Sequence, residues 1–251
     1  MGQLTENQLH QEALYNFPYH YLDLKVEEYK LLRSIEYLSY IELVKNLLKP
    51  YNGDLILDAG CGDGRLCYEL KEDNVRIVGV DFSESAIAFA KAFNPDVKFL
   101  VQDLEQLHLP YKFDYIFLVE TLEHFIPEKI PVILQKLSNV LAKDGKLIVT
   151  VPSRNLPMVQ RHYQHFTKES LTRILEPHFK IVTIFGYSKI GYKRNIFDNL
   201  RRVGFLLYPL RSRIKSVRRF LHFLAGYYER NLAVDDPDKC RGLIGVCEKA
   251  S

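Results

Sequence analysis

Several common features are missing from this sequence, and each absence narrows what the protein can be. The 251 residues include no tryptophan and two methionines, and the four cysteines form no C-x-x-C pair and have no histidines at zinc spacing. This cysteine pattern argues against a structural zinc site and a disulfide framework. The sequence also lacks a signal peptide and any apolar run near the roughly 20 residues that cross a bilayer. We therefore expect a cytoplasmic protein with reduced thiols.

Net charge is also low, at +3, but it is unevenly distributed. Residues 193–219 contain nine basic residues and one acid, Asp198, so this stretch carries +8 and the rest of the chain carries −5. A chain that is acidic outside one segment is not expected to bind nucleic acid over its whole surface. The pattern predicts a local surface that faces anions.

Short apolar runs alternate with helix-like segments from residue 54 onward. Strands are predicted at residues 54–60, 76–82, 97–103, 113–120, 146–152, 179–187 and 240–249. Helices are predicted at residues 21–49, 65–71, 83–93, 131–145 and 167–178, with Gly145 closing the fourth of them. Strands that alternate with helices at this spacing predict an α/β fold, in which helices cover both faces of a parallel sheet.

These elements divide the chain into three parts. Residues 1–50 are expected to form an N-terminal helical cap, and residues 51–187 with 239–251 to form the α/β core. Residues 188–238 form a basic, mostly helical insertion between the last two predicted strands. Connections as long as this usually have a function in compact domains.

The segment DLILDAGCGDGR joins the first strand of the core to the helix that follows. Its glycines, which let a ligand approach bare backbone, are Gly60, Gly62 and Gly64. A dinucleotide-binding loop has a third glycine where this chain has Arg65. Asp58 also disfavours a pyrophosphate, since the two negative groups would repel each other. The segment therefore predicts a ligand with a positive charge near Asp58.

Two more acids follow the next two strands. Asp81 ends the second strand, where a carboxylate can accept hydrogen bonds from both hydroxyls of a ribose. Asp103 ends the third strand, within reach of an adenine amino group, and Leu104 would flank the adenine ring. The predicted pocket suits adenosine joined to an amino acid, with no phosphate groups.

Five segments, in this order, resemble the class I S-adenosylmethionine-dependent methyltransferases. They are LDAGCGDGR, VDFSESAI, VQDLEQL, FDYIFLVETLEHF and LSNVLAKDGKLIVTVPS, and the resemblance covers roughly residues 55–185 and the last strand. It implies a doubly wound, Rossmann-like sheet of seven mostly parallel strands whose last strand is antiparallel. It also implies S-adenosylmethionine as the cofactor and S-adenosylhomocysteine as its product.

This family resemblance places a set of residues around the cofactor. The core positions are Asp58, Gly60, Cys61, Gly62, Gly64, Asp81, Phe82, Asp103, Leu104 and Glu120. Tyr19 and Tyr21 lie at the start of the first predicted helix, in a region that often covers the cofactor in this family. Their rings either lie against the sulfonium through cation–π attraction or are ordinary core aromatics.

Three histidines are candidates for a general base. A sulfonium methyl is already electrophilic, so the protein mainly has to align the acceptor and exclude water. For an oxygen acceptor a base helps to remove the proton, and His162, His165 and His124 are the candidates. Arg161 and Tyr163, which come from the same segment as the first two, are expected to contact the acceptor.

Metal binding is an alternative role for the same region. Glu120, Glu123 and His124 are spaced to share one helical face. E-x-x-E-H followed by a later histidine resembles ubiquinone-biosynthesis O-methyltransferases and small-RNA 3′-terminal 2′-O-methyltransferases. Metal ligation also needs converging side chains with supporting contacts, which a sequence does not show. Because metal-free relatives share LEH, we expect no metal, with Glu120 at the methionine end of the cofactor.

Three interpretations fit the basic insertion. We expect a lid whose Arg201 and Arg202 bind an anionic acceptor, since elements between the last two strands commonly shape the acceptor pocket in this superfamily. Otherwise the insertion contacts an anionic membrane peripherally, or is a solvated helical pair. Nucleic acid is not favoured, because the sequence contains no known binding module.

The sequence as a whole predicts a methyltransferase that acts on an oxygen of a small acceptor, which is an anionic, nucleotide-linked or glycan-linked metabolite. The stretch HYQHFTKESL is similar to bacterial methyltransferases of glycan and secondary-metabolite pathways. The alternatives are a metal-assisted RNA 2′-O-methyltransferase and a cofactor-binding scaffold without catalysis.

Overall fold

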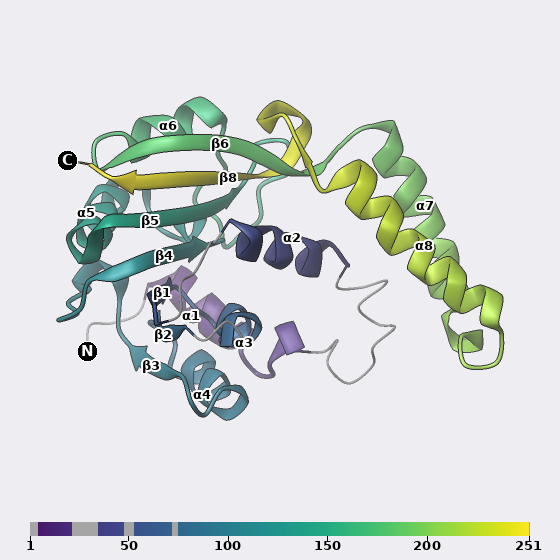
Figure 1. Cartoon of the computed structure of the whole chain (residues 1–251), viewed down its shortest axis with the longest axis horizontal. Helices are drawn as coiled ribbons and strands as arrows, with labels where there is room; N and C mark the ends of the chain where they lie inside the picture. The colour runs from purple at the N-terminus through teal and green to yellow at the C-terminus, as the bar shows by residue number, and fades with distance from the viewer. Residues whose placement is uncertain (1–4, 22–34, 48–52, 72–74, 251) are drawn as a thin grey trace.

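A computed structural model of the chain describes residues 5–21, 35–47, 53–71 and 75–250. Within these residues, an eight-stranded sheet runs through the centre of the molecule with helices on both sides (Figure 1). Its strands are β1 (Leu55–Ala59), β2 (Arg76–Asp81), β3 (Lys98–Val101), β4 (Phe113–Val119), β5 (Leu141–Pro152), β6 (Phe179–Lys189), β7 (Val234–Asp235) and β8 (Cys240–Lys249).

The strands follow the order β3-β2-β1-β4-β5-β8-β6-β7. The first five of these are parallel, whereas β8 lies antiparallel between β5 and β6. This confirms the predicted sheet of mostly parallel strands with an antiparallel last strand. The two residues of β7 add an eighth strand beside β6, which the apolar pattern does not predict. The strand order reverses between β1 and β4, and α/β proteins bind ligands at such a point.

Different helices cover the two faces of the sheet. Ile56 and Leu57 are neighbours in β1, so their side chains point to opposite faces. Ile56 belongs to a buried cluster with α2 (Ile35–Asn46), α3 (Arg65–Leu70) and α4 (Glu84–Phe93). Leu57 belongs to the other cluster, with α5 (Ile130–Val140) and α6 (Lys168–Leu175).

The N-terminal region adds a helix, α1 (Glu6–Leu14), that begins with a capping box between Thr5 and Gln8. Short 3-10 turns join several of the longer elements. They are η1 (Tyr19–Tyr21), η4 (Leu104–Gln106), η5 (Leu122–His124), η6 (Pro127–Lys129), η7 (Tyr208–Leu210) and η8 (Pro237–Lys239).

Two of the predicted helices need revision. The helix expected at residues 131–145 ends at Val140, and β5 begins at Leu141, so Gly145 lies within a strand and caps no helix. A Cβ at Gly145 would lie 2.9 Å from the carbonyl oxygen of Phe113 on β4, which explains the glycine. Of the helix predicted at 21–49, the structure shows α2, and residues 22–34 and 48–52 lie outside the described ranges.

The insertion forms a helical hairpin. α7 (Tyr192–Leu207) and α8 (Lys215–Leu232) are joined through η7 and extend away from the sheet, on the right-hand side of Figure 1. The hairpin has a small core of its own, which also takes in Ile35 of α2. Its residues are Phe197, Leu221, Leu224, Tyr228 and Leu232. None of the described helices has the length and apolar character that crossing a membrane requires.

One carboxylate on α2 connects the hairpin to the core. Glu36 binds Arg194 and Arg201 of α7 at 2.5 and 2.8 Å, and Arg241 of β8 at 3.1 Å. Arg194 is buried and also pairs with Asp198, one helical turn further along α7. Because three arginines from two elements share Glu36, its charge holds α2, α7 and β8 together.

Replacing Glu36 with glutamine should therefore lower the free energy of unfolding by roughly 1–3 kcal/mol, since a partly exposed group shared by three arginines loses its charge. Urea unfolding followed by circular dichroism measures this value. Glu42→Gln, on the exposed side of the same helix, is the matched control and should change it by less than about 0.5 kcal/mol. Equal effects of the two substitutions would contradict the role of Glu36.

Candidate functional site

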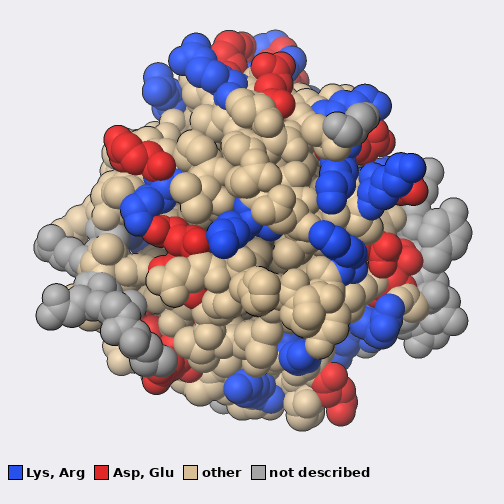
Figure 2. Space-filling view, turned by 90° about the vertical axis from the view of Figure 1, so that its left-hand side faces the viewer, with Lys and Arg blue, Asp and Glu red and all other residues tan. Residues whose placement is uncertain are grey.

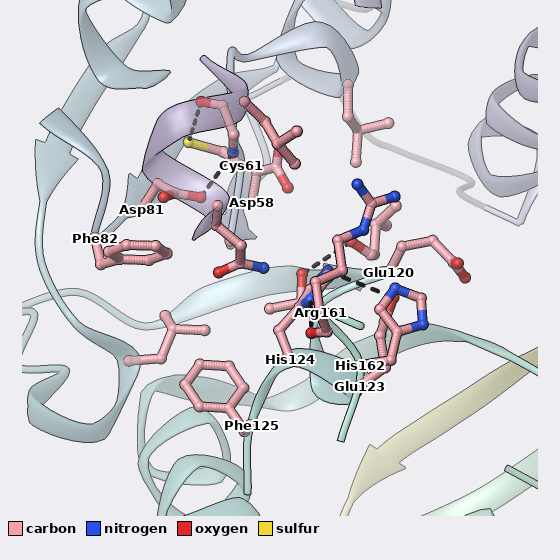
Figure 3. A pocket seen from close by; sticks show the side chains of 18 of the residues that line it. Asp58, Cys61, Asp81, Phe82, Glu120, Glu123, His124, Phe125, Arg161 and His162 are labelled. Atoms are coloured by element: carbon pink, nitrogen blue, oxygen red, sulfur yellow. Dashed lines mark hydrogen bonds and ion pairs between the residues drawn. The ribbon is translucent and has the colours of Figure 1, made fainter. Parts of the chain in front are cut away.

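A cavity of about 510 Å³ lies at the carboxyl ends of β1, β2 and β4, where the strand order reverses. Two groups of side chains face it from opposite sides (Figure 3). The first, called here the glycine-loop half, contains Asp58, Cys61, Asp81 and Phe82. The second, the histidine half, contains Glu120, Glu123, His124, Arg161 and His162.

The loop after β1 brings bare backbone to the glycine-loop half. Gly60 and Gly62 have φ angles of +78° and +52°, in the left-handed region that favours glycine. A Cβ on Gly60 would lie 2.6 Å from the side chain of Thr121, and one on Gly62 would lie 2.5 Å from the Tyr15 hydroxyl. Gly64, predicted to contact the cofactor, does not line the cavity and instead caps α3.

Asp58 and Asp81 are buried, and no basic side chain of the described residues pairs with either. Asp58 accepts a hydrogen bond from the Cys67 thiol at 3.3 Å, and Asp81 accepts from the backbone N–H groups of Gly62 and Ser83, both at 2.9 Å. Burial raises the pKa of Asp58 to about 7 and that of Asp81 to about 6. Buried acids in this arrangement fit a ligand that brings a positive charge and hydrogen-bond donors.

The predicted adenine end of the site also lies at the cavity. Asp103 and Leu104 both line it. Asp103 accepts a hydrogen bond from the backbone N–H of Glu105 at 2.9 Å and from the Gln8 side chain of α1 at 3.4 Å. The N-terminal helix thus contacts the acid that is expected to recognise adenine, which sequence reasoning did not assign.

The two N-terminal tyrosines differ from the other predicted contacts. Tyr21 is buried and stacks on Phe93 with ring centroids 3.9 Å apart, and it does not line the cavity. Contact between Tyr21 and a sulfonium is therefore not seen, and the alternative of a core aromatic is correct. The side chain of Tyr19 lies outside the described part of the chain. Tyr15 and Tyr37 line the cavity in their place.

A buried network beneath the glycine loop also escaped sequence reasoning. Asp63, which is fully buried, lies 2.9 Å from Nδ1 of His20. Arg65 donates to the His20 carbonyl at 2.5 Å and pairs with Glu69 at 2.7 Å. Arg65 stands where a dinucleotide-binding loop has its third glycine, and it connects η1 to the glycine loop. This unusual residue was the signal by which the sequence could have indicated the network.

Glu120 directly follows β4 and has a φ of +45°, which is uncommon for a residue with a side chain. Its Oε1 accepts hydrogen bonds from Tyr187 at 2.8 Å and from Thr150 at 3.3 Å. Tyr187 comes from β6 and has Gly242 opposite it on β8, where a Cβ would lie 2.2 Å from the tyrosine ring. Sequence reasoning missed Tyr187, since only the strand register pairs it with that glycine.

The expected helical face of Glu120, Glu123 and His124 is not formed. Residues 122–124 make a single 3-10 turn, and Glu120 precedes it. Glu123 is 1% exposed, and one of its carboxylate oxygens has no hydrogen-bond partner among the described residues. Burial raises the pKa of both carboxyl groups.

Hydrogen bonds determine which ring nitrogen of each histidine carries the proton and which keeps a lone pair. Nδ1 of the buried His165 lies 3.1 Å from the Leu156 carbonyl and so donates to it, which makes Nε2 of a neutral ring an acceptor. Nδ1 of His162 lies 2.8 Å from that Nε2 and donates, so Nε2 of His162 keeps its lone pair. His124 likewise donates through Nδ1 to the Arg161 carbonyl at 3.1 Å.

The three histidine candidates are thus separated. His124 and His162 line the cavity, whereas His165 lies behind His162 and orients it. Burial lowers the pKa of His124 to about 4 and that of His162 to about 3. Both rings are therefore neutral near pH 7, with an unprotonated Nε2.

Three of these side chains also lie close enough together to hold a metal ion. One carboxylate oxygen of Glu123 and one ring nitrogen each of His124 and His162 lie within 4.8 Å of one another. Each histidine has its other nitrogen hydrogen-bonded, as metal-binding histidines usually do. A carboxylate and two imidazoles suit divalent transition metals. The described residues fit such an ion, which sequence reasoning did not favour.

The predicted acceptor contacts fall into two groups. Arg161 and Tyr163 line the histidine half, as expected. Arg201 binds Glu36, which lines the cavity, whereas Arg202 is exposed and contacts Asn199. Of the described residues of the predicted insertion, 188–238, only Ser188 at its start lines the cavity, and the hairpin of α7 and α8 does not cover it in this structure.

Comparison with known sequences finds similarity to methyltransferases in the central part of the chain. The family model described as "Methyltransferase domain" matches residues 56–145. A ubiquinone biosynthesis O-methyltransferase from Bradyrhizobium diazoefficiens is 32% identical over 113 residues, which are 43% of this chain and 44% of that protein. The chain spans about half the length of the curated relatives it matches.

Comparison with solved structures extends the likeness to the whole fold. The N-methyltransferase NodS from Bradyrhizobium japonicum, solved with S-adenosylhomocysteine, has a TM-score of 0.65 at 13% identity over 98% of this chain and 100% of that chain. The [4+2]-cyclase SpnF has a TM-score of 0.55 at 18% identity over 85% of this chain and 81% of that chain. The matched domain and the strand order make the core of this chain similar to the class I S-adenosylmethionine-dependent methyltransferases.

Proposed function

We propose that the chain binds S-adenosylmethionine in the glycine-loop half of the cavity and is an active methyltransferase. The observation that carries this proposal is the pair of buried acids, Asp58 and Asp81, which no basic side chain of the described residues neutralises. The ammonium of the donor would neutralise Asp58. Its ribose hydroxyls would donate to Asp81, whose oxygens each accept one backbone hydrogen bond and keep a further lone pair.

The histidine half provides what a transfer to oxygen needs from the protein. When bound, the donor supplies an electrophilic methyl group. His162 lines the cavity and keeps the lone pair of Nε2, so it could take the proton of an acceptor hydroxyl as the carbon–oxygen bond forms, the methyl–sulfur bond breaks and S-adenosylhomocysteine leaves. His165 holds the His162 ring in that orientation through its own bond to the Leu156 carbonyl. The two residues act as a base and a positioning residue.

A small molecule methylated on oxygen is the acceptor that we favour. The cavity of about 510 Å³ has to hold donor and acceptor together, which limits the part of the acceptor that enters. Arg161 lines the histidine half and would favour an anionic acceptor, such as a nucleotide-linked or glycan-linked metabolite. The likeness to a ubiquinone biosynthesis O-methyltransferase supports oxygen as the methylated atom.

Metal-assisted methyl transfer, including transfer to an RNA 2′-hydroxyl, is the second candidate. The convergence of Glu123, His124 and His162 is the specific observation in its favour. These residues would hold a divalent ion that lowers the pKa of an acceptor hydroxyl. In this case His162 would be a ligand and could not also be the base.

Affinity for S-adenosylmethionine should rise with pH, because a cation prefers the ionised form of Asp58. With a pKa of about 7 in the free protein, binding should be roughly fivefold tighter at about pH 7 than at about pH 6, below the range in which the donor's own ammonium loses its proton, and should release a proton near neutrality. Calorimetry in buffers of different ionisation enthalpy measures both effects. Asp58→Asn should bind more weakly and without this pH dependence. Absence of any binding heat with the unmodified protein would refute the proposed donor.

His162→Gln should reduce methyl transfer by roughly 10²- to 10⁴-fold without changing donor affinity, because the donor lies in the other half of the cavity. The assay uses methyl-labelled donor with fractions of a cell extract as the source of acceptor. A small-molecule product supports the proposal, an RNA product supports the second candidate, and no product indicates a scaffold. His108→Gln, an exposed histidine outside the cavity, is the matched control and should retain full activity.

Removal of metal separates the two candidates. If His162 is the base, methyl transfer should survive exhaustive chelation. If Glu123, His124 and His162 hold an ion, the purified protein should contain about one equivalent of divalent metal, and chelation should abolish transfer until Mn²⁺ or Zn²⁺ is added. Glu123→Gln should then lose the metal, as elemental analysis would show, while donor affinity stays unchanged.

A further inference from the structure

The outer face of α7 carries apolar side chains that no other described element covers. Tyr192, Ile196, Val203 and Leu206 are all exposed, at 72% for the first and 79% for the last. With about 3.6 residues per turn, these positions lie within an arc of roughly 80° on one side of the helix, which they share with one exposed polar residue, Asn199. Leu210 and Ile214 continue the exposed apolar surface into the turn before α8.

The opposite side of α7 explains why this stripe faces outward. Arg194 and Arg201 point to the core, where both bind Glu36, and Phe197 is buried against α8. The helix therefore satisfies its contacts with the protein on one side only. A soluble helix would normally carry polar residues on the remaining side.

The hairpin that carries the apolar stripe is also rich in basic residues. Between Asp198 and Glu229 the sequence contains seven arginines and lysines and no acid. The exposed members of this group are Arg202, Arg213, Lys215, Arg218 and Arg219. By contrast, the end of the molecule away from the hairpin, shown in Figure 2, has Lys and Arg interspersed with Asp and Glu. The hairpin tip, defined here as residues 202–219, is thus both apolar and of a single charge sign.

We propose that the hairpin tip docks on the surface of an anionic lipid bilayer. Exposed aliphatic and aromatic side chains enter the boundary between headgroups and acyl chains, while arginines and lysines beside them attract anionic headgroups. Long basic side chains suit this boundary, since their apolar stems lie along the acyl chains and their charges stay in the headgroup region. The contact is peripheral.

Two other occupants fit these observations less well. A second copy of the chain would place one unbalanced basic tip against another, and like charges oppose such a contact. The stripe also has only about six apolar residues, whereas a standard protein interface takes roughly 20–30 residues a side. RNA would match the charge, but exposed valine, leucine and isoleucine offer neither stacking nor hydrogen bonds to bases.

Vesicle co-sedimentation tests the proposal without donor or acceptor, so its outcome is independent of the proposed methyl transfer. The protein should bind vesicles of phosphatidylcholine mixed with phosphatidylglycerol, bind vesicles of phosphatidylcholine alone at least about tenfold more weakly, and dissociate from the former in high salt. Equal binding to the two vesicle types, or no binding to either, would overturn the proposal.

Two pairs of double variants separate the apolar and charged contributions. Val203→Ser with Leu206→Ser, and Arg213→Glu with Arg219→Glu, should each weaken vesicle binding by about tenfold or more. The matched controls are Val132→Ser with Val182→Ser, and Lys91→Glu with Arg173→Glu, which alter exposed residues outside the hairpin and should leave binding unchanged. Losses as large in the controls as at the tip would contradict a site on the hairpin.

Three further measurements complete the test. Circular dichroism and thermal unfolding should show all variants folded, because every altered side chain is exposed. Sedimentation velocity without lipid should show a monomer for the unmodified protein. Self-association that the apolar double variant abolishes would instead show that the stripe binds a second copy of the chain. RNA binding that depends on the same arginines, in a protein that ignores vesicles, would assign the tip to nucleic acid.

Discussion

Burial of carboxylates at the ends of neighbouring parallel strands is the constraint on which the site depends. Removing Asp58 and Asp81 from water disfavours their charged forms, and the fold provides hydrogen bonds from a thiol and two backbone N–H groups but no counter-ion among the described residues. A cationic ligand that approaches the backbone at Gly60 and Gly62 would offset this electrostatic cost of burying the two carboxylates. The glycines and the acids are thus two parts of one requirement, since neither recognises such a ligand without the other.

The histidine half obeys a different constraint, because its residues come from two segments, one that follows β4 and one that follows β5. What makes it a site is a series of hydrogen bonds that ends at backbone carbonyls and thereby decides which nitrogen of His124 and His162 is unprotonated. A lone pair held at a cavity can take a proton or bind a metal ion. The geometry therefore prepares both chemistries equally, and the buried, partly unpartnered carboxylate of Glu123 is what adds the metal to the candidates.

The parts that could be predicted from sequence are those set by local pattern. Apolar strands such as Phe113–Val119, and the acids that end strands, follow from periodicity and from the resemblance of short segments. The missed features depend on tertiary contacts. Gly145 looks like a helix cap until the carbonyl of Phe113 is found beside it, and Tyr187 becomes a site residue only through its register with Gly242. The burial of Tyr21 depends on Phe93, more than seventy residues away, which no local pattern reveals.

Glu36 connects the cavity with the hairpin of α7 and α8. It lines the cavity, and it also binds Arg194 and Arg201 on the inner side of α7, whose outer side bears the apolar stripe. Arg194 and Arg201 therefore contribute to the internal structure, whereas exposed arginines such as Arg202, Arg213 and Arg219 face solvent. The basic segment thus has both a structural and a surface part. Because α7 is held to the core by this shared carboxylate, a bilayer bound at the hairpin tip would keep the cavity at a set distance and orientation. Such an arrangement would suit an acceptor presented at a membrane surface as well as one that diffuses freely, so under the two proposals the hairpin would set how far from a bilayer methyl transfer takes place.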